Sequence, residues 1–539
     1  MAERTRQISN EMITQLPLFD ANGSFGKPCR TEPEYPTAAA YLTHLDRLGV
    51  QRGLVYSVEG SEFHPATGNR KLLAELDATP GAHERLAPAL VIGMQMRHEM
   101  GAMEELKAMM RTRRIRALRA FPTRMRHALG QLEPVIEELA AFEPTLFLDS
   151  REGVPVHDLL AFANRFPSVP MVYMQGMWGN LPTMFDLLRR CPNIVIETSW
   201  IHSRNSIELM AREFGAKRLI FGLGYRSHAG ASIAELAHLD LDPAGVRLLA
   251  HENLERLLGL RPGASEERKP AAPLFQRLIE GRPLELDLVD AHGHMGPFGR
   301  WLQGDAEWEE QIPDAVRRMD KIGIKTMIVS GLHAIFSDPL EGNRLLEARL
   351  AGYGERFRGY FVFNPCYADE LVSHFDEFFA HPFWVGFKVH TSGWCLPVTD
   401  PRFEPMFAYA NRRRLPILFH TWDGPYDTPF MFTEIVKRHP EAIFIMGHSG
   451  GGTNARIQAE QLAAENPNVF LEWCGSFTTP RLYEGTLRRV GADRVLFGTD
   501  GMLHSFAWEL GRFLSLDLPE AQLRPALGPN MRRILALRR

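Results

Sequence analysis

Residues 286–296 read LDLVDAHGHMG, an apolar run that leads directly into the tripeptide His-Gly-His. The run has the length and composition of a buried strand. His292 and His294 are two positions apart, so on a strand both imidazoles point the same way and can reach one point just past its C-terminal end. This geometry is typical of metal ligands. Two histidines in an ordinary loop would give the same motif, so the interpretation depends on further ligands elsewhere.

More short apolar runs follow in the second half, separated by amphipathic stretches with helical periodicity, such as 341–351, 402–413 and 428–438. The strands predicted in this half are 286–290, 326–330, 360–363, 385–389, 416–419, 443–446, 469–472 and 494–497. Eight strand–helix units in about 260 residues predict an α/β fold of the TIM-like (β/α)8 type. Active-site groups are then expected at the C-terminal ends of the strands.

The first half repeats the sequence pattern of the second. FDANGSFG at 19–26 aligns with VDAHGHMG at 289–296, and AKRLIFG at 216–222 aligns with ADRVLFG at 492–498. The offset between aligned positions drifts little along the half, which indicates a tandem duplication. We therefore predict two tandem barrels, at 1–260 and 273–539, of which the first is less regular. The segment 261–272, RPGASEERKPAA, has the Pro, Gly and charge content of a linker.

Composition narrows the class of protein. The 61 basic and 65 acidic residues are interspersed and give a net charge of −4, which predicts neither a nucleic-acid partner nor a membrane contact. The five cysteines form no CxxC pair, which fits a reducing cytoplasm. We find no apolar run of 18 or more residues and no secretion signal near the N-terminus. The expected partner is a small-molecule substrate, and a homo-oligomer stays open.

Polar residues that suit a divalent metal site follow five of the eight predicted strands in the second half. They are His292 and His294 at the first strand, Lys388 and His390 at the fourth, His420 at the fifth, His448 at the sixth and Asp500 at the eighth. A single histidine in such a place is more often a packed or surface residue. Five coincident strand ends are difficult to obtain by chance, so the sequence predicts a metal-dependent active site.

Further residues lie just beyond the strand ends. Trp394, Trp422, Trp473 and His504 could form the wall of a pocket for an aromatic or planar substrate. They could equally pack the rim of the barrel. His390 is two positions from Lys388, so both are expected to face the pocket.

The second half resembles the amidohydrolase superfamily over nearly all of 286–539. The pieces FKVH at 387–390, FHTW at 419–422, GHSGG at 447–451 and FGTD at 497–500 are similar to the amidohydrolase-related branch that also contains metal-dependent decarboxylases. The resemblance implies that one metal ion is held by His292, His294, His420 and Asp500, with His448 as the acid/base beside it. In some relatives the strand-4 lysine is carboxylated and bridges two ions. Lys388 could take that role, or pair with a substrate carboxylate or a neighbouring acid.

These roles have a physical basis. An open zinc site lowers the pKa of bound water to about 7. The Asp500 carboxylate could accept a proton from that water, and His448 could shuttle it. We therefore expect one divalent ion, zinc before manganese or another first-row metal. The predicted activity is hydrolysis of an amide, lactone or related bond. The alternative is a decarboxylase of an aromatic or unsaturated acid, with Lys388 or Arg456 as the cation for the departing carboxylate.

The first half has different residues at every one of these positions. The counterparts of His292, His294, Lys388, His390, His420, His448 and Asp500 are Asn22, Ser24, Arg119, Phe121, Leu148, Gln175 and Gly224. Leucine and glycine offer no side-chain ligand, so the same metal site cannot form there. The first half is therefore predicted to be a non-catalytic copy, a pseudoenzyme domain that keeps the fold. A repurposed pocket is the alternative.

Overall fold

The computed structural model describes residues 16–29, 31–262, 270, 272–300, 302–304, 307–475 and 482–539. The chain divides into two compact units, Met1–Glu280 and Gly281–Arg539. Most of the linker predicted at 261–272 lies outside the described residues. Helix α14 (Pro273–Ile279) belongs to the first unit, where the Leu278 carbonyl accepts a hydrogen bond from His238 Nε2 at 2.9 Å. The second unit therefore begins at Gly281 and not at residue 273, where the sequence placed its start.

In the described part of the second unit, eight parallel strands form one sheet in sequential order. They are β10 (Leu288–Met295), β11 (Ile324–Gly331), β12 (Phe357–Val362), β13 (Trp384–Val389), β14 (Pro416–His420), β15 (Ile443–Gly447), β16 (Val469–Trp473) and β17 (Val495–Phe497). Gly501 closes the sheet, because its N–H donates to His292 O at 3.2 Å and its carbonyl accepts from His294 N at 2.8 Å. The predicted TIM-like barrel is confirmed, with each strand close to its predicted place.

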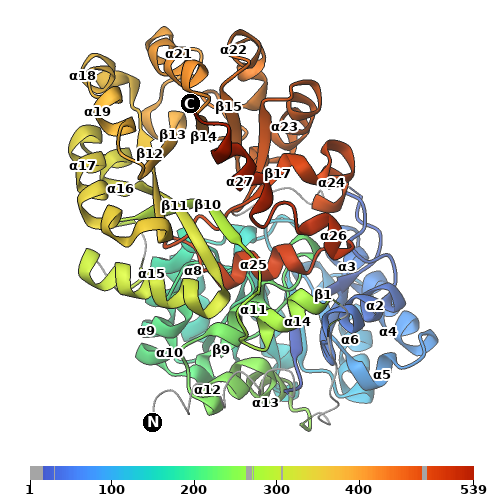
Figure 1. Cartoon of the computed structure of the whole chain (residues 1–539). Coiled ribbons are helices and arrows are strands. Elements are labelled where there is room, and N and C mark those ends of the chain that lie inside the picture. The colour runs from blue at the N-terminus through green and yellow to red at the C-terminus, as the bar shows by residue number, and fades with distance from the viewer. Residues whose placement is uncertain are drawn as a thin grey trace. The chain divides into compact units, whose positions relative to one another are not determined.

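Helices lie outside these strands; in Figure 1, α17 to α23 surround β12 to β15. The described helices of the second unit are α15 (Trp308–Ile322), α16 (Leu332–Phe336), α17 (Pro339–Leu350), α18 (Ala368–Ser373), α19 (Phe375–Phe379), α20 (Thr391–Trp394), α21 (Glu404–Arg413), α22 (Thr433–Arg438), α23 (Thr453–Glu465), α24 (Tyr483–Val490), α25 (Phe506–Leu514), α26 (Glu520–Leu523) and α27 (Pro529–Ala536). The predicted helix at 428–438 begins as a 3-10 turn with Thr428 at the N-cap position. Its hydroxyl donates to Gln458 Oε1 at 2.7 Å and does not cap the turn.

The core of the second barrel lies inside the sheet. Its members alternate along the strands and include Val289, Ile328, Tyr360, Leu418 and Leu496. Met531 and Ile534 of α27 join this core. The interior is therefore filled by side chains, as in other barrels of this type, and functional groups have room only at the ends of the strands.

The first unit is also a parallel α/β barrel, less regular as expected. Its described strands form a three-stranded and a six-stranded sheet: β1 (Phe19–Phe25), β2 (Arg52–Ser57), β3 (Leu86–Pro88), then β4 (Leu90–Ile92), β5 (Ala117–Ala120), β6 (Thr145–Asp149), β7 (Met171–Met174), β8 (Ile194–Glu197) and β9 (Leu219–Ile220). Only Ala89 separates β3 from β4, so the two pieces occupy one strand position. Ala21 N donates to Phe221 O at 3.1 Å and joins β1 to the segment after β9.

Described helices alternate with these strands along the chain. They are α2 (Ala38–Leu48), α3 (Val58–Glu62), α4 (Pro65–Ala78), α5 (Ala82–Arg85), α6 (Ala102–Arg113), α7 (Glu133–Leu139), α8 (Val156–Arg165), α9 (Leu181–Arg190), α10 (Ser206–Phe214), α11 (Ala231–His238), α12 (Pro243–Arg247) and α13 (Asn253–Leu258). The interior core of this barrel includes Leu254, Leu257 and Leu258 of helix α13.

Several buried hydrogen bonds recur at aligned positions of the two units. Asn193 and Asn468 each precede a strand, and each donates from Nδ2 to three backbone carbonyls in the connection that leads from a helix into the preceding strand. For Asn193 these are the carbonyls of Ala163, Phe166 and Val169, from the end of α8 to β7; for Asn468 they are those of Val436, His439 and Ala442, from the end of α22 to β15. These amides bind the carbonyls of the connection, of which those of Phe166 and His439 also accept a turn hydrogen bond from Val169 N and Ala442 N. An asparagine side chain therefore makes the same hydrogen bonds at the equivalent position of both units.

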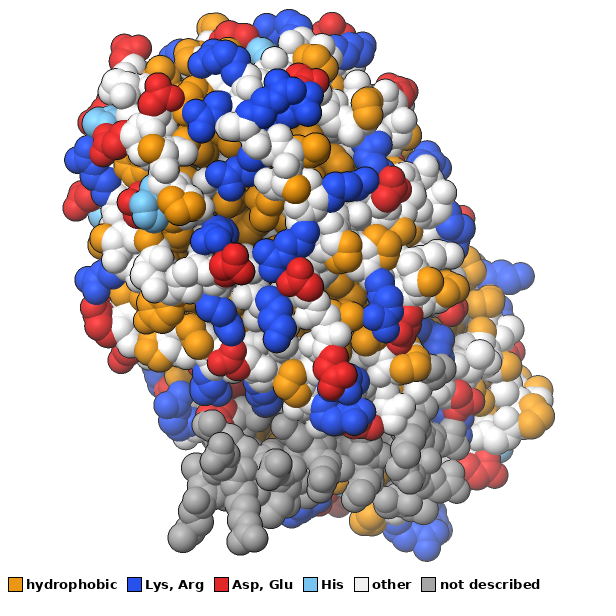
Figure 2. All heavy atoms as spheres, viewed as in Figure 1, with side chains coloured by type: hydrophobic (Ala, Val, Ile, Leu, Met, Phe, Trp, Pro, Cys, Tyr) orange, Lys and Arg blue, Asp and Glu red, His pale blue; other side chains and the backbone are white. Residues whose placement is uncertain are grey.

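The surface carries both signs of charge. On the face drawn in Figure 2, Lys and Arg side chains are interspersed with Asp and Glu. This agrees with the mixed charge pattern of the sequence. No helix in the described ranges is long and apolar enough to cross a membrane.

Candidate active site

The paired histidines lie within β10 rather than past its end, because the strand continues to Met295. His292 is fully buried and His294 is 5% exposed. The pairing of β10 with β11 shifts register between Asp290 and Gly293, and Asp290 Oδ1 accepts a hydrogen bond from His292 N at 3.1 Å. Such an irregularity re-aims side chains at a strand end. The two Nε2 atoms meet at 3.2 Å.

Asp500 completes a group of three converging donor atoms. It follows β17 with a positive φ of 55°, and its Oδ1 lies 3.0 Å from His294 Nε2 and 3.6 Å from His292 Nε2. Ligands bonded at about 2.0–2.2 Å to one ion lie roughly 3–3.5 Å from one another. The three atoms therefore have a spacing that one divalent ion could bridge, and their role as ligands stays a prediction.

The outer nitrogen of each histidine is held by a partner. His292 Nδ1 lies 3.0 Å from Glu472 Oε2, and His294 Nδ1 lies 3.0 Å from Ser330 Oγ. Metal-bound histidines commonly donate their second N–H to an outer acceptor, which fixes the tautomer and turns the other lone pair toward the ion. The donor chemistry of this pair thus fits a metal site.

His420 shows the same pattern beside this group. It is the last residue of β14, and its Nδ1 lies 2.7 Å from Asp427 Oδ2 while its Nε2 bonds to none of the described residues. Its ring stacks on His390 with centroids 4.4 Å apart and lies 5.0 Å from the ring of His448. The role of His420 as a fourth ligand stays a prediction.

Lys388 places a buried cation at the centre of the group. It lies in β13, is 1% exposed, and its Nζ is 2.7 Å from His292 Nε2. Burial lowers the pKa of Lys388 to about 8, so the ammonium is still charged at neutral pH. Arg456, the other cation considered from the sequence, instead donates from Nε to Ser449 O at 3.0 Å and covers the Tyr483 ring. Lys388 is therefore the cation of this site.

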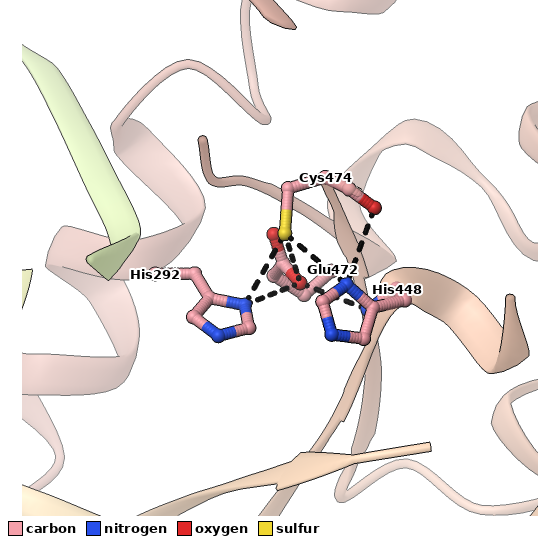
Figure 3. A group of neighbouring side chains, drawn as sticks. All are labelled: His292, His448, Glu472 and Cys474. Carbon is pink, nitrogen blue, oxygen red and sulfur yellow. Dashed lines mark hydrogen bonds and ion pairs between the residues drawn. The ribbon is translucent and has the colours of Figure 1, made fainter. Parts of the chain in front are cut away.

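His448 lies opposite His292, with ring centroids 5.1 Å apart. Its backbone N–H donates to Glu472 Oε2 at 3.0 Å, and its Nδ1 lies 3.4 Å from Cys474 O. In Figure 3 the Nδ1 atoms of both rings face Glu472 and Cys474, and the Nε2 atoms point away from them. Burial lowers the pKa of His448 well below its usual value, and its Nε2 bonds to none of the described residues. That nitrogen is free to meet a substrate.

Glu472 and Cys474 were not assigned to the site from the sequence. With His292 and His448 they form a second close group of possible ligand atoms. Burial raises the pKa of the Cys474 thiol well above its usual value, which keeps it protonated, and it raises the pKa of Glu472 to about 8. We therefore interpret the pair as hydrogen-bond partners that orient the two imidazoles. A glutamate at the end of the same strand in both halves was the available signal.

Comparison with known proteins gives the family. The family model described as "Amidohydrolase" matches residues 69–260 and 289–537, which is most of the chain. The chain belongs to the amidohydrolase family. Each unit of this amidohydrolase contains one matched region, and residues 1–68 of the first unit lie outside the match. No sequence among curated proteins matches it significantly.

The matches between this amidohydrolase and solved structures cover about half of its chain. A dihydroxybenzoic acid decarboxylase from Polaromonas sp. JS666, with bound manganese and 2-nitroresorcinol, is 18% identical, with a TM-score of 0.38, and the match covers 47% of this chain and 97% of that one. The 5-carboxyvanillate decarboxylase from Sphingomonas paucimobilis is 13% identical, with a TM-score of 0.37, and the match covers 47% of this chain and 99% of that one. An amidohydrolase of unproven activity from Staphylococcus aureus is 14% identical, with a TM-score of 0.38, and the match covers 46% of this chain and 99% of that one.

The predicted substrate-side residues of this amidohydrolase differ in their surroundings. Trp422 is half-buried, and its ring centroid lies 5.7 Å from that of His448. Trp394 donates from Nε1 to Ile335 O at 2.8 Å and packs against a small apolar cluster, so it contributes to rim packing. Trp473 is 1% exposed and stacks under Arg512, whose guanidinium lies 4.5 Å from its ring, which makes it part of the core.

His504 lies against Asp500, a predicted metal ligand, rather than against open space. Its Nδ1 lies 3.0 Å from Glu509 Oε1, and its Nε2 lies 3.7 Å from Asp500 Oδ2. Burial alone would raise the pKa of Asp500, but His292, His504 and the hydrogen bond from His294 hold it well below its usual range. Asp500 is thus kept as a carboxylate in a buried position.

Proposed function

We propose that the second unit is a metal-dependent enzyme that removes CO2 from a small aromatic or unsaturated carboxylic acid. The observation that carries this proposal is the buried Lys388 ammonium, 2.7 Å from His292 Nε2 within the group of ligand atoms. A fixed cation at this place can pair with a substrate carboxylate. The decarboxylases named above catalyse the same class of reaction, and their likeness to this chain is confined to the fold.

One divalent ion would be held by His292, His294 and Asp500, with His420 as the predicted fourth ligand. Such an ion supplies positive charge that binds and polarises the oxygens of the substrate. We propose zinc; a set of histidines and a carboxylate also accepts manganese or another first-row ion. The 3.0–3.6 Å separations of the three donor atoms support one ion at this place.

The residues of the chain would then divide the work. Lys388 orients the carboxylate, and the half-buried Trp422 offers a flat surface to the substrate ring. The bond between carbon and carboxylate breaks, its electron pair stays on the carbon, CO2 leaves, and the carbon takes a proton. His448 would relay that proton, because burial lowers its pKa and keeps the ring neutral, so that its Nε2 takes a proton from water, leaving hydroxide, and passes it to the carbon.

Hydrolysis of an amide or lactone is the second candidate. It is favoured by Asp500, which the site keeps as a carboxylate and which could accept a proton from an attacking water. Hydrolysis needs no cation for a substrate carboxylate, so in a hydrolase Lys388 would instead take the other role considered from the sequence, that of a carboxylated lysine between two ions.

We further propose that the two units arose by duplication and that the first is not catalytic. The recurrent amide–carbonyl hydrogen bonds of Asn193 and Asn468 support a common origin. The strand pairing corrects one aligned position, because it places Asp149, and not Leu148, at the counterpart of His420. The Asp149 carboxylate is engaged by Arg151, and Gly224, at the counterpart of Asp500, offers no side-chain donor atom. A metal ion bound in the way proposed for the second unit would have too few ligands in the first.

The test is CO2 release from a panel of hydroxybenzoic acids by the metal-loaded full chain, beside cleavage of simple lactones and anilides. Lys388→Met is expected to lower kcat/KM at least about 30-fold, since a buried charge pair contributes about 2–5 kcal/mol. The control is Lys437→Met, an exposed lysine of α22 paired with Glu434, which should leave kcat/KM unchanged. Cleavage of a lactone or anilide without CO2 release from any acid would overturn decarboxylation.

A further inference from the structure

Arg119 of the first unit is a buried cation without an anionic partner. It lies in β5, is 2% exposed, and its guanidinium packs over the rings of Tyr56 at 4.6 Å and Phe121 at 5.5 Å. Its Nε is buried without a hydrogen bond, and the residue forms no hydrogen bond or ion pair with the described parts of the chain. A buried charge left in this state is costly unless something else pairs with it.

The carboxylates around Arg119 are already engaged. Asp149 accepts two parallel hydrogen bonds from Arg151, at 3.0 Å and 2.7 Å. Asp20 accepts from Leu223 N at 2.7 Å and from other donors of its own barrel. The Glu197 carboxylate accepts three hydrogen bonds, from Gln175 N at 3.0 Å, Ser199 N at 2.6 Å and Ser199 Oγ at 3.0 Å. Asp149 and Glu197 favour the charge of Arg119 only at longer range, and none of the three carboxylates forms an ion pair with it.

Other polar atoms at this end of the first barrel also lack partners. Four buried atoms make no hydrogen bond with described residues: Asn22 Nδ2, Gln175 Oε1, Trp200 Nε1 and Ser203 Oγ. They come from β1 and from the segments that follow β7 and β8, at the strand ends where barrel ligands bind. A group of unsatisfied donors and acceptors in one place indicates a polar occupant.

The alignment of the two units brings these residues together. Asn22, Arg119 and Gln175 are the counterparts of His292, Lys388 and His448. In the second unit, Lys388 Nζ touches His292 Nε2 at 2.7 Å and the two imidazole rings lie 5.1 Å apart. The backbone at the aligned sites matches as well, because Gln175 and His448 both have a positive φ and both donate their N–H to the glutamate of the next strand at 3.0 Å. The three side chains therefore face one space.

We propose that this end of the first barrel binds a small organic carboxylate, with Arg119 as its counter-ion. A planar guanidinium matches a carboxylate through two parallel hydrogen bonds. The amides of Asn22 and Gln175 offer a donor and an acceptor to other polar groups of the ligand. Tyr56 and Phe121 hold the guanidinium in its plane by stacking. The site would bind and not catalyse in the manner of the second unit, because Asn22, Ser24, Gln175 and Gly224 replace the imidazoles and the carboxylate of that site.

The test uses benzoate as the probe and the full-length chain. All variants carry Lys388→Met and are titrated after metal removal with a chelator, which takes away both groups proposed to bind a carboxylate in the second unit, so failure of the proposed enzyme activity would not affect the outcome. Isothermal titration is expected to give one benzoate per chain in this background. Arg119→Met should abolish the binding, and Arg119→Lys should weaken it at least about 10-fold because a lysine cannot form the paired hydrogen bonds. Arg114→Gln, at an exposed arginine after α6, should bind as the background does.

Thermal unfolding adds a readout that a purely structural role would not give. Removing an uncompensated buried charge is expected to leave the melting temperature of the ligand-free Arg119→Met variant unchanged or higher. Benzoate at about 100 times its Kd should raise the melting temperature of the background by a few degrees and that of Arg119→Met not at all. Should Arg119→Met fail to fold, Arg119→Lys decides the question by titration. The proposal is overturned if the background binds no benzoate, or if it binds benzoate equally well after Arg119→Met or Arg119→Lys.

Discussion

Replacing Glu472 by glutamine tests whether the outer hydrogen bonds hold the metal ligands in place. Glu472 Oε2 accepts from His292 Nδ1 at 3.0 Å and from His448 N at 3.0 Å, and Oε1 is buried without a partner. Glutamine has nearly the same shape, so the packing is kept. The carboxylate charge is lost, and an amide NH2 takes the place of Oε1.

The expected loss of metal affinity in Glu472→Gln can be worked out from these contacts. A hydrogen bond to a charged acceptor contributes about 1.5–3 kcal/mol and a neutral one about 0.5–1.5, so each bond loses roughly 1–1.5 kcal/mol. Only the bond to His292 acts on a metal ligand, which corresponds to about a 10-fold loss of metal affinity. The buried NH2 without an acceptor adds strain at the same point. The total expected loss is about 10- to 100-fold, the usual range for an outer partner of a metal-bound histidine.

Metal affinity would be measured by competition with a chromophoric chelator. The assay is run at pH 9, since burial raises the pKa of Glu472 to about 8 and the carboxylate is then charged. Glu197→Gln is the matched control, because Glu197 accepts the corresponding backbone N–H of Gln175 in the first unit. It should leave metal affinity unchanged. Equal metal affinity in wild type and Glu472→Gln would refute the role of Glu472 in holding the site.

Three further outcomes are expected. His448→Ala should retain most of the metal by elemental analysis and lose about 10²- to 10⁴-fold in rate; a metal-free variant would instead make His448 a ligand. Asn468→Ala should lower the free energy of urea unfolding of the second unit by about 3 kcal/mol, since three carbonyls lose their donor, and Asn193→Ala should do the same to the first. Burial lowers the pKa of His44 to about 3, so between pH 6.5 and 3 the unfolded chain binds a proton that the folded chain excludes. Stability therefore falls with falling pH by up to about 1.4 kcal/mol per unit, and urea titrations from pH 7 to 5 should show a shallower fall for His44→Phe than for the exposed control His157→Gln.

The sequence by itself determined the second barrel and the main residues of its site. Buried parallel strands must be short and apolar, and the helices between them amphipathic, so the alternation of the two periods located each strand. The residues predicted as ligands could be picked out because each lies at the end of such a run, as His420 does at the end of β14. Sequence also located most of the altered positions of the first half, but the counterpart of His420 needed the strand pairing, which makes it Asp149 and not Leu148.

Only the tertiary structure decided how these residues meet. Glu472 is 180 positions from His292, and closure of the barrel brings the two within hydrogen-bonding distance. The choice between Nδ1 and Nε2 as the inward nitrogen depends on such distant partners, which no local pattern reports. The position of Lys388 within the donor group has the same origin, because it lies on a different strand. Arg119 follows the same physical rule: its charge could be read from the sequence, but its lack of a partner is a property of everything packed around it.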